Sequence, residues 1–184
     1  MNRNLTGTVG LAAVAAVAGL AAAGCGSSTS TVAATSSGTQ NIAGTVSGPA
    51  AIANEATVPL TLKGLVNTTG KIKLMSNNQQ KSATIQTQQG NLDVTHTAGR
   101  TTTRLLSSKT CKFAVGVHAT YTVVGDKSTG KFKNAKGNGN VTLLYTATLP
   151  KRSDGACDVS SNARPLPGHA QVSFAARGPL TLKH

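Results

Sequence analysis

The sequence of 184 residues has few acidic and few aromatic side chains. Only five Asp and Glu stand against 18 Lys and Arg, and the chain has no Trp, two Tyr and three Phe. A catalytic pair of carboxylates therefore has few positions to come from. The shortage of aromatic rings also argues against a stacking platform for nucleic acid bases or sugars.

Charge is absent from a long N-terminal stretch, since no charged residue occurs between Arg3 and Glu55. Within it, residues 9–23 contain only Ala, Val, Leu and Gly. This run is shorter than the roughly 20 apolar residues that a membrane-spanning helix needs. A short apolar run behind one positive charge and before small residues is typical of a secretory signal peptide, so we predict export from the cytoplasm.

The apolar run ends in Ala22-Ala23-Gly24-Cys25, which resembles the lipobox of bacterial lipoproteins. The resemblance implies that residues 1–24 are removed and that Cys25 becomes an acylated N-terminal residue carrying chains such as palmitate. The protein is then expected to be lipid-anchored at the extracytoplasmic face of the cell membrane, in the bacterial cell envelope. Ala22 stands where a lipobox usually has Leu, and ordinary secretion with cleavage near residues 21–23 is the alternative.

Three cysteines are an odd number for an exported protein. If Cys25 is acylated, Cys111 and Cys157 remain as one pair, and an oxidising compartment favours a disulfide between them. The alternative is two free thiols in a reducing cytosol, which the predicted signal peptide argues against.

Residues 26–57 are small and polar, without an aromatic side chain, Lys or Arg. Such a segment buries too little apolar surface to offset the entropy of ordering it. We therefore interpret residues 25–57 as the acylated cysteine with a flexible Ser/Thr/Gly/Ala tether, and residues 58–184 as a single folded domain.

Apolar residues alternate with polar ones along much of residues 58–184, most clearly in 113–123 and 141–149. A period of two predicts half-buried strands, and Gly, Asn, Asp and Ser at short intervals favour antiparallel connections. The expected fold class is all-β, an antiparallel barrel or sandwich. The similar segments VPLTLKG (58–64) and GPLTLKH (178–184) suggest two strands that pair with each other and close a barrel.

Residues 121–143, YTVVGDKSTGKFKNAKGNGNVTL, contain the pattern T-G-x-F-x-x-A-x-G-x-G. They resemble a hairpin of allene oxide cyclase-like and dirigent-like β-barrels, with Thr129, Gly130, Phe132, Ala135, Gly137 and Gly139 at the matching positions. The resemblance implies a barrel whose end is capped by inward-turned Phe132 and Ala135. Enzymatic activity is not carried over from the family, because its polar and acidic interior residues cannot be placed in this sequence.

The titratable residues form no recognisable catalytic or metal motif. Asp154 and Asp158 are the one close pair of carboxylates, and we interpret them as loop residues rather than as an acid and base. No two of the four histidines, His96, His118, His169 and His184, have a local metal-ligand spacing, so neither a metal nor a cofactor is predicted. His96 shares a face with Leu92 and Val94, which points it toward the barrel interior.

The strongest chemical signal is the formal net charge of +13. Such a charge attracts anionic membranes and polyanions, whereas export argues against nucleic acid as a partner. Four lysines crowd one predicted hairpin and are the candidate anion-binding residues: Lys127, Lys131, Lys133 and Lys136. The predicted function is a membrane-anchored binding module for anionic lipid or acidic wall polymer.

Two other functions remain open at the level of sequence. The first is a small-ligand carrier or isomerase-like enzyme that uses the barrel interior, where the alternation places Tyr121, Tyr145 and His96. An interior packed solid with apolar side chains would exclude it. The second is a structural surface protein whose basic residues only keep it soluble.

Overall fold

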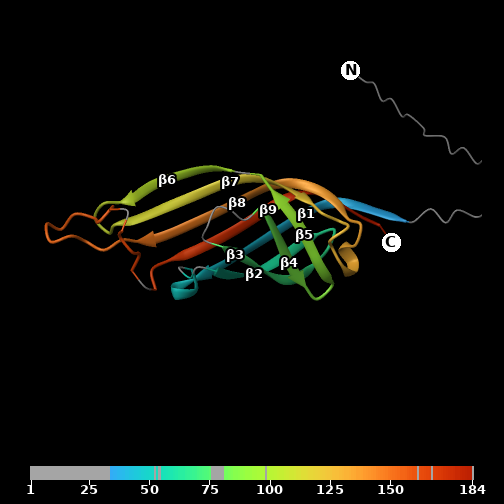
Figure 1. Ribbon diagram of the computed structural model, residues 1–184, viewed down its shortest axis with the longest axis horizontal. Coiled ribbons are helices and arrows are strands. Elements are labelled where there is room, and N and C mark those ends of the chain that lie inside the picture. The colour runs from blue at the N-terminus through green and yellow to red at the C-terminus, as the bar shows by residue number, and fades with distance from the viewer. Residues whose placement is uncertain are drawn as a thin grey trace, which may run out of the picture. The chain divides into compact units, whose positions relative to one another are not determined.

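The computed structural model describes residues 34–51, 53, 55–75, 81–97, 99–160, 162–166 and 168–183. In these residues, nine strands form one antiparallel sheet in the order β5-β4-β3-β2-β1-β9-β8-β7-β6 (Figure 1). The elements are β1 (Thr35–Ser47), η1 (Gly48–Ala51), β2 (Glu55–Gly64), β3 (Thr68–Met75), β4 (Ser82–Thr87), β5 (Gly90–His96), β6 (Arg100–Ser107), β7 (Lys112–Val123), η2 (Gly130–Phe132), β8 (Lys136–Thr148) and β9 (Gln171–Lys183). The predicted all-β class is confirmed.

Strand β7 closes the sheet into a barrel. One of its edges pairs with β8 along residues 112–122, and the other edge is divided between β5 and β6. Tyr121 and Val123 pair with His96 and Val94 of β5, which in turn pairs with β4. Eight strands therefore make a continuous ring, and β6 lies outside it.

Strands β5 and β6 follow the same edge of β7 as two halves of one bent strand. His96 faces Tyr121 and Arg100 faces His118, so the bent strand has one residue more than β7 between these pairs. An extra residue of this kind is a β-bulge, which bends the strand that carries it. Beyond the bend, no described strand pairs with the outer edge of β6.

The predicted boundary between tether and domain at residue 58 is wrong. Strand β1 lies wholly inside the predicted tether, and every one of its residues has a partner in β9. The small side chains of β1 resemble those of a linker, which is why the sequence predicted a tether. They also suit a strand that is paired closely with a neighbour on each edge. At Gly44, for example, a Cβ atom would lie 2.0 Å from the Pro59 carbonyl oxygen of β2. Backbone pairing and the buried side chains of Gln40 and Ile42 compensate for the missing bulk.

The expected pairing of the two similar segments is also wrong. Residues 58–64 lie in β2 and residues 178–183 in β9, and these strands flank β1 from opposite sides. Their likeness reflects similar environments on either side of one central strand, since Leu62 and Leu182 are both almost fully buried.

The barrel is densely packed at the end where η2 lies. Phe132 is fully buried and Ala135 nearly so, which confirms that both turn inward. Gly130, with φ of 58°, begins this turn in a conformation that favours glycine. Phe132 and Ala135 thus form a plug. At the same end of the barrel, the buried side-chain amide of Gln40 accepts a hydrogen bond from the Val66 N–H (2.9 Å) and donates one to the Val66 carbonyl (3.0 Å). These contacts seal one end of the barrel.

Replacing Phe132 by Ala should lower the free energy of unfolding by about 3–5 kcal/mol, because a buried ring is lost and a void remains. Denaturant unfolding followed by circular dichroism measures the change. The neighbouring exposed residue supplies the control, since Lys133→Ala should change the same quantity by less than about 0.5 kcal/mol. Equal effects of the two substitutions would contradict the plugged end.

Candidate functional site

The other half of the barrel encloses a cavity of about 260 Å³. Its lining is mainly aliphatic and includes Ile42, Leu74, Val117, Val141, Leu143 and Phe174. The polar side chains in the lining are His96, Thr97, Thr101 and Tyr121. No Lys, Arg, Asp or Glu of the described residues lines it. An apolar cavity with a few polar groups has the character of a small-molecule site.

The hollow arises from small inward-facing side chains at mid-barrel and from the divided edge of β7. Ala119 and Ala176 face the space that a larger residue would fill. The exposed lining residues Thr97, Gly99 and Thr101 belong to the bulge and the start of β6, so the mouth of the cavity lies there. Access therefore exists where the bent strand leaves the ring.

An apolar strip continues from the cavity along the same face of β7 and β8. Phe113, Val115 and Tyr145 are only half-buried, and the rings of Phe113 and Tyr145 meet edge-to-face with centroids 5.7 Å apart. On the paired strand β6, Leu105 is 45% exposed. Partly exposed apolar surface of this extent next to a cavity is typical of a binding region.

The inward positions predicted for His96 and Tyr121 are confirmed, since both line the cavity. They are cross-strand partners on β5 and β7, which places their side chains next to each other. Tyr121 is 7% exposed, and burial raises the pKa of its phenol, which keeps the hydroxyl neutral. Tyr145 does not line the cavity but packs against Phe113 farther along the strip. Sequence alternation thus found two of the polar lining groups.

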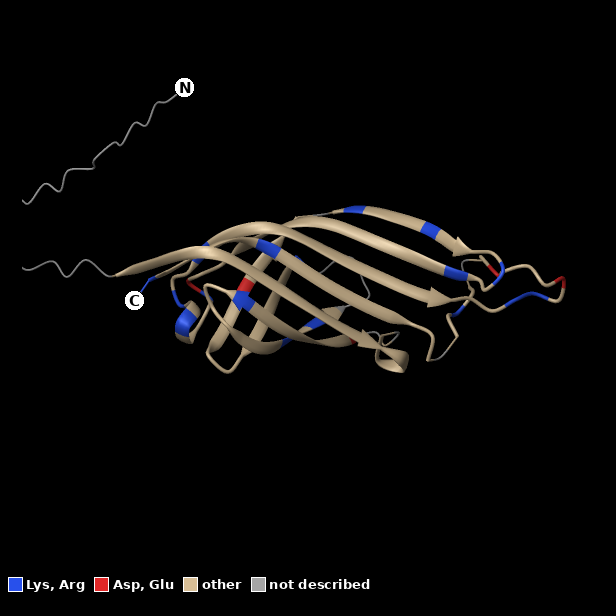
Figure 2. Cartoon of the chain, turned by 180° about the vertical axis from the view of Figure 1, so that it is seen from behind, with Lys and Arg blue, Asp and Glu red and all other residues tan. Residues whose placement is uncertain are grey.

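The four candidate anion-binding lysines, Lys127, Lys131, Lys133 and Lys136, lie at the plugged end of the barrel. All four are exposed in the segment from the end of β7 to the start of β8, and none forms an ion pair with another described residue. Lys183 at the end of β9 and the first residue of β1 are partners at this same end. Figure 2 shows the basic residue of η2 near the C-terminal end of β9. We call this surface the lysine end.

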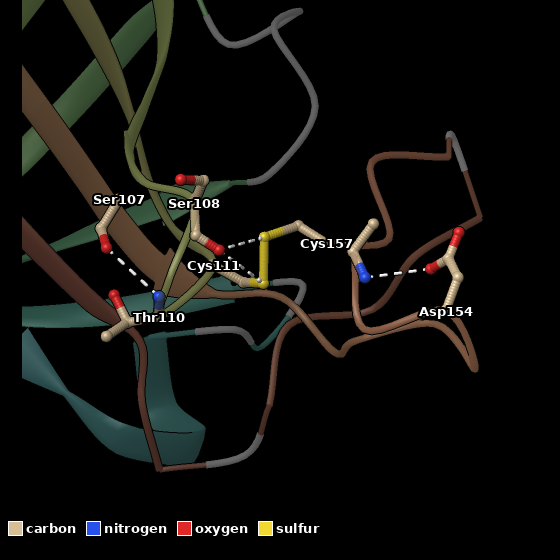
Figure 3. Close-up of a disulfide and its surroundings, with 7 residues drawn as sticks. Ser107, Ser108, Thr110, Cys111, Asp154 and Cys157 are labelled. Carbon is tan, nitrogen blue, oxygen red and sulfur yellow. Dashed lines mark hydrogen bonds between the residues drawn. A yellow bond between two sulfur atoms is a disulfide. The ribbon is translucent and has the colours of Figure 1, made fainter.

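The predicted disulfide between Cys111 and Cys157 is confirmed, with the two Cα atoms 5.3 Å apart. It joins the β6–β7 turn to the long β8–β9 connection (Figure 3). Both sulfur atoms contact the Ser108 carbonyl oxygen, and the Ser107 hydroxyl accepts a hydrogen bond from the Thr110 N–H. The bridge therefore fastens the end of the sheet opposite the lysine end.

The remaining titratable candidates lie outside the cavity. Asp154 forms an ion pair with Arg152 (3.0 Å), and Asp158 accepts a hydrogen bond from Ser160, which lowers the pKa of its carboxyl. Both belong to the β8–β9 connection. His118 faces outward and bonds the Thr142 hydroxyl. Within the described ranges, no three His, Cys, Asp or Glu side chains converge as metal ligands.

Two predictions for the N-terminal segment lie outside the described residues, namely the signal peptide of residues 1–24 and the acylated Cys25. In the part of the chain that the structure describes, no helix has the length and hydropathy to cross a membrane. No family model, curated protein or solved structure matches the chain.

Sequence reasoning missed the lining residues of β1, β3 and β4. Ile42 lies in the segment interpreted as tether, although Ile42, Gly44 and Val46 do alternate with polar residues. Ile72 and Ile85 sit in short alternating runs that predict strands but not which strands meet. The pairing that brings them together joins residues far apart in the chain, and the sequence carries no direct signal for it.

Replacing both Cys111 and Cys157 by Ala should lower the free energy of unfolding by about 4 kcal/mol, because the bridge spans 46 residues and restricts the unfolded chain. Denaturant unfolding measures this loss. A reductant should destabilise the wild-type chain by a similar amount and leave the double variant unchanged. A wild-type protein whose unfolding midpoint ignores the reductant would contradict the role of the bridge.

Proposed function

We propose that the barrel binds a small apolar ligand in its cavity, in a protein that is exported and anchored through Cys25. The observation that carries the proposal is the contrast between the two halves of one barrel. One half is plugged by Phe132, whereas the other leaves about 260 Å³ open behind an apolar lining in which no described residue is Lys, Arg, Asp or Glu. Such a cavity favours an uncharged ligand with a large apolar surface.

The size of the cavity sets the size of the ligand. At about 30 Å³ for each small group, the space holds a ligand of roughly nine heavy atoms. Transfer of an eight-carbon chain contributes roughly 6 kcal/mol at about 0.8 kcal/mol per buried CH₂. After the cost of association, we expect dissociation constants of tens of micromolar or weaker for a plain chain of this length. Longer ligands extend along the apolar strip.

Binding rather than catalysis fits the polar groups that are present. General acid–base catalysis needs one group that donates a proton and one that accepts a proton at the same reacting centre. No described carboxylate lines the cavity to take either role. His96 and Tyr121 leave an isomerase-like reaction as a second use of the same cavity. We place ligand binding first because it requires only the apolar lining.

A bromoalkane tests the location of the ligand. The chain has no Trp, so the substitution Leu143→Trp introduces a single indole into the cavity wall. Titration with 1-bromooctane should quench its fluorescence in a saturable manner, because the bound bromine contacts the indole.

Leu144→Trp is the matched control, since Leu144 is adjacent in β8, faces outward and is 41% exposed. Its quenching should rise linearly without saturation. Both variants are used as full chains with Cys25→Ser, so that no attached acyl chain competes. Identical quenching curves for the two indoles would overturn the proposed cavity site.

A second candidate function is contact of the lysine end with an anionic membrane surface. Its four lysines are exposed and lack acidic partners in the described part of the chain. The described chain begins at Ala34 at this same end. The nine residues 26–34 span at most about 32 Å, so an acylated Cys25 would keep the lysine end close to the lipid headgroups. Each Lys near such a surface contributes about 1 kcal/mol.

The full chain with Cys25→Ser should bind vesicles containing phosphatidylglycerol at low ionic strength and release them as salt screens the charges. Replacing Lys127, Lys131, Lys133 and Lys136 by Gln should weaken this binding at least about tenfold. Vesicle sedimentation measures both.

A charge-matched control separates the lysine end from net charge. Changing Lys81, Lys109, Lys112 and Lys151 to Gln removes the same number of charges from exposed positions outside the lysine end. This variant should keep most of the vesicle affinity. Equal weakening of both variants, or no binding by the wild-type chain at low salt, would refute contact through the lysine end.

A further inference from the structure

We infer that the cavity selects ligands that carry one neutral oxygen function, a carbonyl or a hydroxyl, on an otherwise apolar body, and that the phenol of Tyr121 binds that oxygen. The inference rests on the proposed function and names the chemical class of its ligand. It follows from the place of Tyr121 in the cavity, from the lack of a hydrogen-bond partner for its hydroxyl among the described residues, and from a described lining without Lys, Arg, Asp or Glu.

The ring of Tyr121 is seated between two strands. On one side its partner is His96 of β5, and on the other its partner is Gly139 of β8. A Cβ atom at Gly139 would lie 2.8 Å from Cε1 of Tyr121, so the ring packs directly over the glycine backbone. With 7% of the residue exposed, the side chain is more than nine-tenths buried while it lines the cavity. The glycine therefore helps to fix where the hydroxyl lies.

The hydroxyl of Tyr121 has no hydrogen-bond partner among the described residues, whereas other polar lining groups do. The Thr97 hydroxyl bonds the Thr120 hydroxyl at 2.9 Å, and Nδ1 of His96 lies 3.4 Å from the Thr97 carbonyl oxygen. Because Tyr121 lines the cavity, a group placed in that space can meet its hydroxyl. A ligand oxygen inside the cavity would supply a hydrogen-bond partner in place of solvent.

The electrostatics of the lining favour a neutral group. In the part of the chain that the structure describes, no Lys or Arg lines the cavity to pair with a carboxylate, and burying an unpaired charge is costly. Burial raises the pKa of Tyr121, so the phenol keeps its proton at neutral pH and donates it in a hydrogen bond. A ketone, ester or alcohol meets both conditions, whereas a plain hydrocarbon leaves the phenol unpaired.

Two ligands of similar size and one matched pair of variants test this selection. Calorimetric titration of the full chain with Cys25→Ser compares 2-octanone with 1-bromooctane. Tyr121→Phe should weaken binding of 2-octanone by about fivefold or more and leave binding of 1-bromooctane within about twofold, because only the ketone loses a hydrogen bond. Tyr145→Phe is the control, because it removes the hydroxyl of a half-buried residue that does not line the cavity, and it should change neither affinity.

Infrared spectroscopy gives a second measurement that a merely structural effect would not move. The carbonyl band of bound 2-octanone should lie at lower frequency in the wild-type chain than in Tyr121→Phe, since a hydrogen bond weakens the C=O stretch. Equal bands, or equal loss of both ligands in Tyr121→Phe, would overturn the role of the phenol. Tighter binding of octanoate than of 2-octanone would overturn the selection of neutral oxygen.

The two proposals fail in different ways. If 1-bromooctane does not bind the wild-type chain, the apolar cavity is not a ligand site and the proposed function falls. If it binds and Tyr121→Phe leaves 2-octanone unaffected, the cavity site stands and the assignment of Tyr121 alone is wrong.

Discussion

The closure of the barrel and the opening of its cavity both depend on one edge of β7, which pairs with two different strands. β7 has two neighbours on the same side, and β5 takes only the pairs near Tyr121 while β6 takes the rest. The first set closes the ring and the second leaves it. A barrel with complete pairing on every strand would have no edge and no lateral entrance. Here the chain bends after His96, so that β5 belongs to the ring and β6 lies outside it. The one extra residue at this bend therefore accounts both for the closure of the barrel and for access to its cavity.

The interior of the barrel is packed differently near η2 and at mid-barrel. Near η2, Phe132 fills the interior, and the amide of Gln40 bonds both the N–H and the carbonyl of Val66. At mid-barrel, the small side chains of Ala119 and Ala176 face the interior, and the Tyr121 hydroxyl has no hydrogen-bond partner among the described residues. An empty apolar space normally lowers stability. The plug at one end and the disulfide at the other provide rigidity that the hollow middle does not, which is how a chain with so few aromatic residues maintains a cavity.

The sequence predicts what depends on local alternation. The inward faces of 113–123 and 141–149, the inward turn of Phe132 and the direction of His96 all follow from a period of two or from a short motif. The sequence does not predict β1, because small side chains that suit a tightly paired central strand look identical to those of a linker. It also does not predict the cavity, whose wall joins Ile42, Ile72 and Val141 through pairings across the whole domain. The pairing partner, rather than the propensity of each strand, is the missing information.

The position of the mouth bears on the route by which a ligand arrives. The exposed lining residues Thr97, Gly99 and Thr101 lie at the bulge, and β6 continues from there toward the disulfide, away from η2. Residues 26–34 would hold the lysine end toward the membrane in a chain acylated at Cys25. In that case the mouth would open to the space beyond the headgroups, and a ligand would enter from the aqueous phase rather than by lateral transfer from the bilayer. A ligand with a neutral oxygen is more soluble in that space than a pure hydrocarbon, so the chemistry inferred for Tyr121 and the direction of the mouth are mutually consistent.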